Sequence, residues 1–232
     1  MDTIIYKLAG TMKAEELFLN VTANNIANVS TDGFKKQKLY FHQIYSAEKD
    51  IISKVCGSFT DFTQGHLIET KDKNDLAIQG EGFLTLSNGE KEFYTKTTKI
   101  FINEDGYMVD RNGYFLIGEK GKIKADRNFY IVEDGNIYDG NKNYIDKLLI
   151  FTFINKNLLS LEGGNYIVNK GGKTNITIPK NFSILQGYKE SSNVDIMREM
   201  INLINVSRIY EAIQKNLYSI DYLYEKLIGT VR

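Results

Sequence analysis

The sequence predicts an α+β protein: N- and C-terminal helices, paired as a coiled-coil-like inner domain, flank a central and mostly antiparallel β domain. Three observations predict it: the distribution of glycine, the spacing of apolar residues at both ends, and a series of turn dipeptides in the middle. Of the 19 glycines, 15 lie between Gly57 and Gly172. Glycine destabilises a helix by about 1 kcal/mol per site relative to alanine, so the glycine-poor ends are expected to be helical.

The N-terminal segment carries a helical pattern whose positions are spaced alternately by three and four residues. Six of its eight positions are apolar. The eight are Ile5, Leu8, Met12, Glu15, Leu19, Thr22, Ile26 and Val29. This spacing is typical of a helix that packs against a partner helix, although a helix packed on its own domain is an alternative. The Ser-Thr-Asp-Gly sequence at 30–33 predicts the end of the helix.

The C-terminal segment repeats the pattern. Its positions are Val206, Ile209, Ile213, Asn216, Ile220, Leu223 and Leu227, preceded by Ile196, Met200 and Leu203. Asn193 or Asp195 is expected to cap the start of this helix, because both side chains can accept a backbone N–H. Since both ends of the chain carry such a pattern, we expect the two helices to pair with each other.

The middle of the chain contains several β-hairpin signals. Asn-Gly or Asp-Gly pairs separate short apolar runs at residues 88–89, 105–106, 112–113, 134–135 and 139–140. These dipeptides favour the turns whose twist matches a pair of antiparallel strands. Pro179 is the one proline, so little interrupts strand pairing.

Composition narrows the classes of function. Twenty-nine Lys and Arg balance 29 Asp and Glu, which argues against a nucleic-acid partner. The apolar fraction of 42% and the charged fraction of 25% are those of a globular protein. Cys56 is the single cysteine and cannot form an internal disulfide. The first residues show no basic stretch followed by an apolar run, so we expect no cleaved signal peptide.

Motifs for catalysis are missing. His42 and His66 do not have the spacing of a metal site, and the glycine pair at 80–82 lacks the third glycine of a dinucleotide loop. The Asp-Gly turns lack the twelve-residue ligand pattern of a calcium loop. We therefore expect no enzyme activity, no catalytic residue, no cofactor, no metal and no small-molecule substrate.

Three sequence blocks resemble a known family. Residues 21–35, VTANNIANVSTDGFK, strongly resemble the N-terminal signature of the flagellar axial proteins, which are the rod and hook subunits of the bacterial flagellum. Residues 74–83, NDLAIQGEGF, resemble the entry to that family's β domain, and 186–211 are similar to its C-terminal helix. The blocks 1–45, 64–118 and 183–228 occur in the family's order. The sequence departs from the family's pattern at 94–101 and 188–191, and is most divergent at 119–182.

The resemblance implies a structural subunit of the flagellar basal-body rod. Length and local sequence are most similar to the proximal rod subunit, with the distal rod or another hook-basal-body subunit as the alternative. The resemblance further implies helical assembly with other rod subunits and with copies of itself, torque transmission from motor to hook, and delivery by the flagellar type III export apparatus. The expected location is the rod within the periplasm.

The resemblance also implies a domain organisation and an interface. The domains expected are 1–45 with 190–232 as a helical inner assembly domain, 46–69 as a connector and 70–189 as a β-rich outer domain. The expected assembly interface consists of Ile5, Leu8, Met12, Leu19, Asn24, Asn25, Ile26, Asn28, Val206, Ile209, Ile213, Ile220, Leu223 and Leu227.

Asn24, Asn25 and Asn28 lie beside the apolar pattern. Their side chains can hydrogen-bond across helices and fix the register, or they can cap the C-terminus of their own helix. Outside the family, two interpretations compete: a self-contained enzyme or a glycan- or protein-binding β domain whose helical ends dimerise, and a surface adhesin with a coiled coil. Neither accounts for the three ordered blocks.

Overall fold

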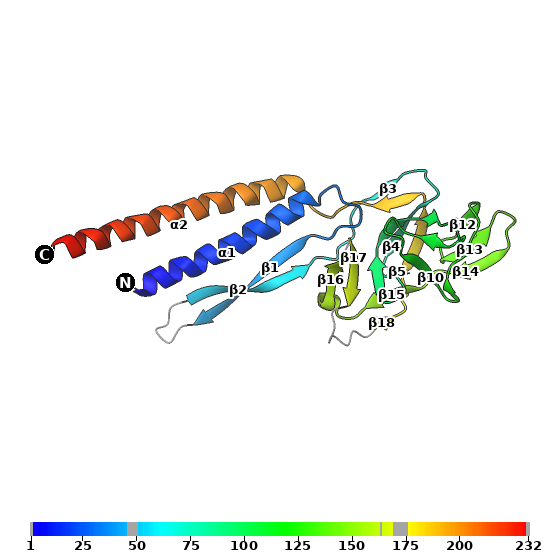
Figure 1. Ribbon diagram of the computed structural model, residues 1–232, viewed down its shortest axis with the longest axis horizontal. Helices are drawn as coiled ribbons and strands as arrows, with labels where there is room; N and C mark the ends of the chain where they lie inside the picture. The colour runs from blue at the N-terminus through cyan, green and yellow to red at the C-terminus, as the bar shows by residue number, and fades with distance from the viewer. Residues whose placement is uncertain (1, 46–50, 163, 169–175, 231–232) are drawn as a thin grey trace. The chain divides into compact units, whose positions relative to one another are not determined.

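The computed structural model describes residues 2–45, 51–162, 164–168 and 176–230. The chain divides into two compact units, each built from separated segments. The helical unit comprises Met1–Val29, Lys36–Asp61 and Val194–Arg232, and the β unit comprises Ser30–Lys35 and Phe62–Asn193. Figure 1 shows the elements of both units.

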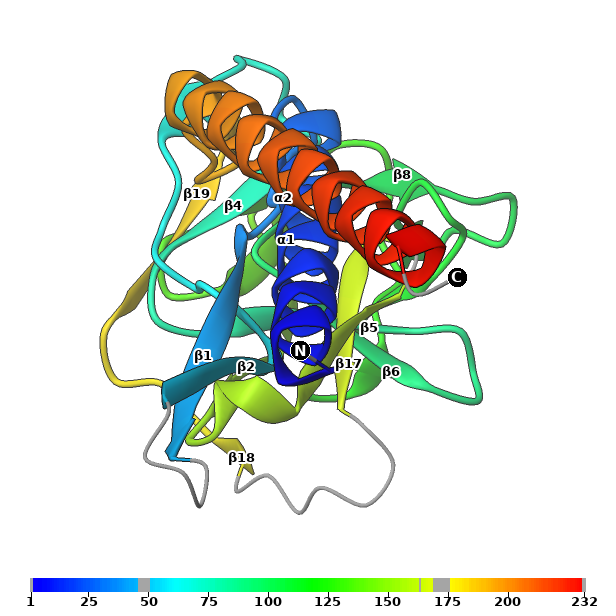
Figure 2. The same cartoon turned by 90° about the vertical axis from the view of Figure 1, so that its left-hand side faces the viewer.

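The helical unit contains two long helices and one hairpin. Helices α1 (Asp2–Ala27) and α2 (Ile196–Thr230) lie side by side and run antiparallel, as Figures 1 and 2 show. Strands β1 (Gln37–Tyr45) and β2 (Ile51–Thr60) pair antiparallel, with a register irregularity between Tyr40 and Phe41. Helix α1 contacts α2 and both strands, so two of its faces are covered within this unit.

The helix ends follow the local sequence. Helix α1 ends at Ala27, and Gly33 has φ +70°, as the Ser-Thr-Asp-Gly signal predicts. At the start of α2, the Asp195 carboxylate accepts the backbone N–H of Arg198 at 3.2 Å and caps the helix. The other predicted cap, Asn193, instead donates to the Thr63 carbonyl at 3.0 Å.

The described strands of the β unit pair only antiparallel. Its largest sheet has ten strands: the path β16 (Leu159–Glu162), β17 (Asn165–Val168), β6 (Glu92–Thr95), β5 (Phe83–Ser87), β10 (Phe115–Gly118), β9 (Met108–Val109) and β8 (Phe101–Ile102), with β11 (Gly121–Lys122), β15 (Ile150–Phe153) and β18 (Ile176–Thr177) beside it. A 3₁₀ helix, Lys156–Leu158, precedes β16.

Three smaller sheets complete the β unit. One has the order β12 (Phe129–Ile131), β13 (Asn136–Asp139) and β14 (Tyr144–Lys147). Another has the order β19 (Phe182–Gln186), β4 (Asp75–Gly80) and β7 (Thr97–Lys99). The last pairs β20 (Tyr188–Glu190) with β3 (Leu67–Glu69).

The predicted turns form, with one difference in detail. Gly89, Gly106, Gly113 and Gly135 all have positive φ, between +80° and +95°. In the turn after β13 the left-handed residue is Lys142, with φ +64°, and not Gly140. The Asp139 carboxylate accepts the N–H groups of Asn141 and Asn143, both at 2.8 Å, and this longer loop moves the left-handed position along the chain.

Two clusters of buried hydrophobic side chains hold the β unit together. The larger consists of Leu76, Ile78, Leu84, Leu86, Phe93, Ile100, Met108, Leu116, Ile123, Ala125, Phe129, Ile131, Ile137, Leu148, Ile150 and Ile184. The smaller is mostly aromatic and consists of Phe83, Tyr94, Phe153, Leu159 and Tyr166, with Phe62 packed edge-on against Phe83 and Tyr166. The α+β architecture with terminal helices and a central antiparallel β domain is thus confirmed.

Two features are absent from the part of the chain that the structure describes. None of the helices is sufficiently long and apolar for a transmembrane segment. No group of three or more His, Cys, Asp and Glu side chains is placed to hold a metal ion.

Candidate assembly interface

The apolar stripe predicted on α1 is partly covered within the helical unit. Leu8, Met12, Leu19 and Ile26 are each partly buried. Burial also raises the pKa of the Glu15 carboxyl on the same stripe above its ordinary value. The side chains of Ile5 on α1 and Leu227 on α2 lie outside the described residues.

The stripe predicted on α2 is covered only in part. Val206 and Ile213 are 2% and 6% exposed, and Ile220 is partly buried. Ile209 and Leu223 are 44% and 58% exposed. The covered positions instead follow another three-and-four spacing: Leu203, Val206, Tyr210, Ile213, Leu217, Ile220 and Tyr224. Both spacings share Leu203, Val206, Ile213 and Ile220, so the sequence pattern alone did not separate them.

Helix α2 also presents apolar side chains that the described residues leave between 40% and 73% exposed. The exposed members are Ile196, Met197, Met200, Ile201, Ile204, Ile209, Tyr218, Tyr222 and Leu223. Met197, Ile201 and Ile204 recur at spacings of four and three and therefore share one side of the helix. An exposed apolar face of this extent is typical of a surface that packs against another protein.

Asn25 joins α1 to the start of β1 by two reciprocal hydrogen bonds. Its Nδ2 donates to the Gln37 carbonyl at 2.9 Å, and the Gln37 N–H donates to its Oδ1 at 2.9 Å. The side chain therefore satisfies both backbone groups of Gln37, as a neighbouring strand would. Asn25 is buried, so losing it would leave those groups without their partner.

Glu199 extends this junction to α2. The Asn25 Nδ2 lies 3.4 Å from Glu199 Oε2, and Lys36 forms an ion pair with Glu199 Oε1. The Glu199 carboxylate is almost fully buried, and a charge in that position needs such partners. One amide thus connects α1, β1 and α2, and we call Asn25, Lys36, Gln37 and Glu199 the helix junction.

The other two predicted asparagines interact locally. The Asn28 Nδ2 donates to the Asn24 carbonyl at 2.9 Å and to its Oδ1 at 3.3 Å, and Asn24 is exposed. Asn25 thus bonds to another helix, whereas Asn28 bonds to the last turn of its own helix and Asn24 supplies the acceptors there. Sequence analysis missed Lys36, Gln37 and Glu199, because no local pattern relates residue 25 to residue 199.

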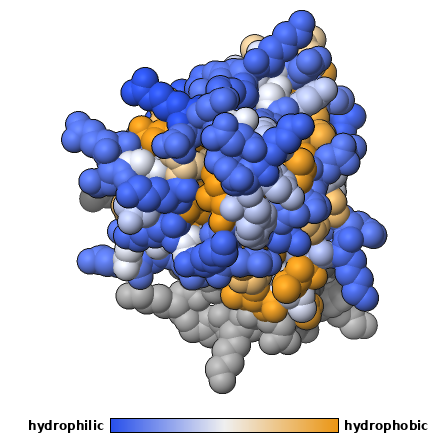
Figure 3. All heavy atoms as spheres, turned by 90° about the vertical axis from the view of Figure 1, so that its right-hand side faces the viewer, coloured by the Kyte–Doolittle hydropathy of each residue, from blue (hydrophilic) through white to orange (hydrophobic). Residues whose placement is uncertain are grey.

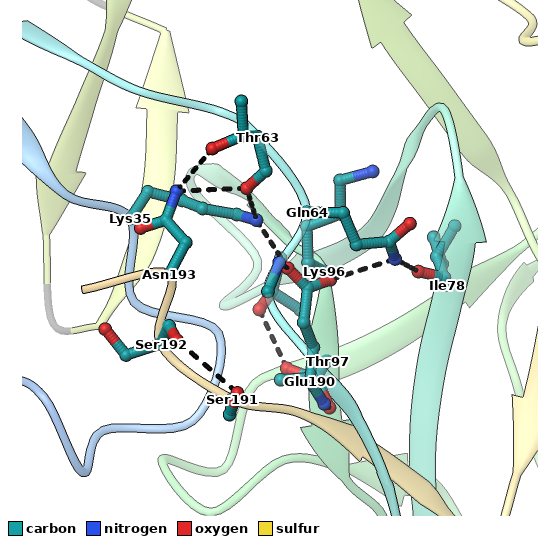
Figure 4. A network of polar contacts seen from close by, with 12 residues as sticks. Lys35, Thr63, Gln64, Ile78, Lys96, Thr97, Glu190, Ser191, Ser192 and Asn193 are labelled. Carbon is teal, nitrogen blue, oxygen red and sulfur yellow. Dashed lines mark hydrogen bonds and ion pairs between the residues drawn. The ribbon is translucent and has the colours of Figure 1, made fainter. Parts of the chain in front are cut away.

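The β unit contains a second buried polar cluster, drawn in Figure 4. Lys35 and Glu190 form an ion pair whose two side chains are completely buried. The Lys35 ammonium also donates to the Thr63 carbonyl at 2.7 Å, and the Gly65 N–H donates to Glu190 Oε1 at 2.9 Å. A side chain at Gly65 would collide with the carbonyl oxygen of Ser191, so the backbone approach there requires glycine.

Gln64 and Lys96 complete the cluster. Gln64 donates to the Ile78 carbonyl at 2.6 Å and to Glu190 Oε2 at 3.3 Å. The Lys96 ammonium donates to the Gly80 carbonyl at 2.6 Å and lies 5.1 Å from the centre of the Phe83 ring. Burial, aided by the nearby positive charge of Lys35 and opposed by Glu190, lowers the pKa of Lys96 to about 8. These groups are engaged in structural hydrogen bonds.

Three family profiles match the chain. The profile described as "Flagella basal body rod protein" matches residues 5–35, and that described as "Flagellar hook protein FlgE/F/G D1 domain" matches residues 77–196. The profile described as "Flagellar basal body rod FlgEFG protein C-terminal" matches residues 185–230. The first covers most of α1, the last contains α2, and the middle one lies almost entirely in the β unit.

Individual relatives agree with these profiles over nearly the whole chain. The flagellar basal-body rod protein FlgG of Buchnera aphidicola subsp. Baizongia pistaciae is 30% identical, over 93% of this chain and 95% of its own. The rod protein FlgF of Buchnera aphidicola subsp. Schizaphis graminum is 32% identical, over 82% of each chain. The FlgG protein of Bacillus subtilis is 25% identical, over 98% of each chain.

Proposed function

Because the chain belongs to the family of flagellar hook and basal-body rod proteins and is a structural subunit of the rod, we propose that it assembles helically into the proximal rod and transmits torque from the motor to the hook. The family is structural and not enzymatic. Its members are parts of the flagellar basal body and assemble with other rod and hook-basal-body subunits.

The observation that carries the assembly proposal is the exposed apolar face of α2. Met197 is 68% exposed and Ile201 is 57% exposed, although both are apolar. Covering such side chains contributes about 25 cal/mol for each Å² removed from water. In a helical assembly, each subunit contacts the next through two different surfaces, and the repeated contact does not close into a ring. Each added subunit can therefore cover part of the exposed face of its neighbour.

We propose that α1 and α2 act as a coiled-coil-like pair within that assembly. The three-and-four spacing of the covered residues on both helices supports this pairing. The expected interface residues then have two roles. Val206 and Ile213 pack within the chain, whereas Ile209 and Leu223 are available to a neighbouring subunit.

The domain assignment remains part of the proposal. Residues 1–45 with 190–232 would form the inner assembly domain, 46–69 the connector and 70–189 the outer domain. The partners proposed are further copies of this chain, other proximal and distal rod subunits, and the type III export apparatus. The location proposed is the periplasmic part of the rod, reached without cleavage of a signal peptide.

The proximal position rests on local sequence. The stretches at 113–123, 134–137 and 145–148 and the short connector between Tyr45 and Gly65 are more similar to the proximal than to the distal rod subunit. The distal rod is the alternative position.

A substitution on the outer face of α2 tests the assembly proposal. We expect the double variant Ile201→Glu, Ile204→Glu to abolish motility and incorporation into purified basal bodies when it replaces the native chain. The matched control, Asn205→Glu with Asn216→Glu, adds the same charge at exposed polar positions of the same helix. Normal incorporation of the Ile201, Ile204 variant would contradict the proposal, as would equal loss in the control.

A further inference from the structure

Lysines occupy alternate positions in and beside β11, at 120, 122 and 124. All three are exposed, whereas Ile123 and Ala125 between and beyond them are buried. Successive side chains of an extended chain point to opposite faces, so the burial of Ile123 places Lys122 and Lys124 on the outer face. Lys120 lies in the turn between β10 and β11.

Each of these ammonium groups lies over an aromatic ring. The distances from Nζ to the ring centre are 3.9 Å for Lys122 and Phe115, 5.4 Å for Lys124 and Tyr107, and 4.8 Å for Lys120 and Tyr144. The rings of Tyr107 and Phe115 contact each other edge to face, 5.7 Å apart. A cation held over a ring loses less conformational freedom when a partner binds.

None of the three ammonium groups forms an ion pair with a carboxylate in the described part of the chain, although the Lys120 backbone N–H donates to the Asp146 carboxylate at 3.3 Å. Lys35, Lys36, Lys38, Lys91, Lys99 and Lys189 each form an ion pair there. No carboxylate of the described residues lies within ion-pair distance of Lys120, Lys122 or Lys124, and Lys120 donates to the Ile145 carbonyl at 2.9 Å. Figure 3 shows one face of the β unit: hydrophilic side chains cover most of it, with smaller hydrophobic patches among them.

We propose that these residues, the lysine strip, dock an extended acidic segment of a neighbouring rod subunit. In an extended peptide, residues two apart share a face and lie about 6.6–6.8 Å from each other. Lys122 and Lys124 repeat at the same interval, so alternate carboxylates can meet successive ammonium groups. The partner is taken from the proposed function, on which this inference therefore rests.

The aromatic rings favour a peptide over a nucleic acid. Recognition of single-stranded nucleic acid uses ring faces on which bases stack. Here an ammonium already lies over each of the three rings, and Tyr130 and Tyr138 on the neighbouring sheet stack on each other with centroids 5.3 Å apart. The net charge of zero adds no general attraction for phosphate.

Binding of a synthetic peptide to the full chain tests the docking chemistry. The probe is a fluorescent peptide of four Glu-Thr repeats, followed by anisotropy at low salt, with a peptide of four Gln-Thr repeats and an eight-nucleotide oligothymidine beside it. We expect the Glu-Thr peptide to bind most tightly. The variant Lys120→Gln, Lys122→Gln, Lys124→Gln should bind it at least tenfold more weakly and keep the same circular dichroism spectrum.

A matched control changes three exposed lysines elsewhere, Lys71→Gln, Lys73→Gln and Lys180→Gln, and should keep the affinity. No binding of the Glu-Thr peptide, tighter binding of the oligothymidine, or equal losses in both variants would overturn the docking chemistry. Incorporation of the strip variant into basal bodies tests the partner separately. Lost peptide binding with normal incorporation would overturn the neighbouring subunit as occupant and leave the rod assignment intact.

Discussion

At the scale of single residues, Asn25 carries the most specific connection in the helical unit. Its amide reaches the backbone of Gln37 and the carboxylate of Glu199, which is 174 positions away. The sequence indicated that an asparagine near the end of the first helix could bond across elements. It could not indicate which asparagine does so, because that depends on where β1 and α2 return in space.

Asn25→Leu is expected to weaken the helical unit and incorporation into the rod, and to leave the β unit folded. Each backbone group of Gln37 that loses its partner costs about 1–3 kcal/mol where it is buried. The same substitution at exposed Asn24 is the control and should have little effect. Thermal unfolding and basal-body incorporation of both variants measure this. Equal behaviour of the two variants would show that the junction does not depend on Asn25.

The buried Lys96 predicts a rise of stability with pH. Its pKa is about 8 in the folded chain and ordinarily 10.5. Between these values the unfolded chain binds more protons than the folded chain, so the free energy of unfolding increases as pH rises from about 8 towards 10. Below pH 8 both states are protonated and this gain is absent. Burial raises the pKa of Tyr94 and Tyr166, which lowers stability only above about pH 10.

Denaturant unfolding at pH 7.5, 8.5 and 9.5 tests the Lys96 prediction. Lys96→Met removes the titrating group, so the difference in unfolding free energy between the native chain and the variant should change steadily in favour of the native chain over this range. Other groups that titrate there cancel in the comparison. A pH-independent difference would mean that Lys96 keeps an ordinary pKa.

The buried pair of Lys35 and Glu190 marks the limit of prediction at this scale. The two residues are 155 positions apart, and each is an ordinary charged residue in its own segment. Lys35 lies in a block that resembles the family, whereas Glu190 lies in the stretch 188–191 that departs from it, so the sequence did not indicate their contact. Their pairing follows from strand order, and strand order is a property of the whole β unit.

At the scale of elements, local chemistry determined most of what could be predicted. The end of α1, the Asp195 cap of α2 and four glycine turns each depend on a few adjacent residues. The covered stripe of α2 was harder to predict, because Ile209 appears a better core residue than Tyr210. A tyrosine can bury its ring and keep its hydroxyl near water, so half-covered positions accept it.

Ile26→Asp tests the covered stripe of α1. A carboxylate placed in this partly buried position loses solvation without gaining a partner, which costs several kcal/mol. We expect the variant to remain soluble but to be absent from the rod, with lost motility. Asn20→Asp, at an exposed position of the same helix, is the control and should support motility. A motile strain with Ile26→Asp would contradict the role of this stripe.

At the scale of the whole molecule, the two units are stabilised differently. Both clusters of buried hydrophobic residues found in the described chain lie in the β unit. The helical unit relies on the polar helix junction and on stripes that are only partly covered. We therefore expect the β unit to be stable in the isolated chain and the helices to gain much of their stability from neighbouring subunits.

Hydrogen exchange with mass spectrometry, on the purified monomer and on assembled rods, tests this account most directly. Residues 76–190 should exchange slowly in both samples. Residues 8–27 and 196–226 should exchange fast in the monomer and slowly in the rod, because neighbouring subunits complete their packing. Helices that are as protected as the β unit in a true monomer, with no further protection in the rod, would contradict the account and indicate that the chain folds completely before it assembles.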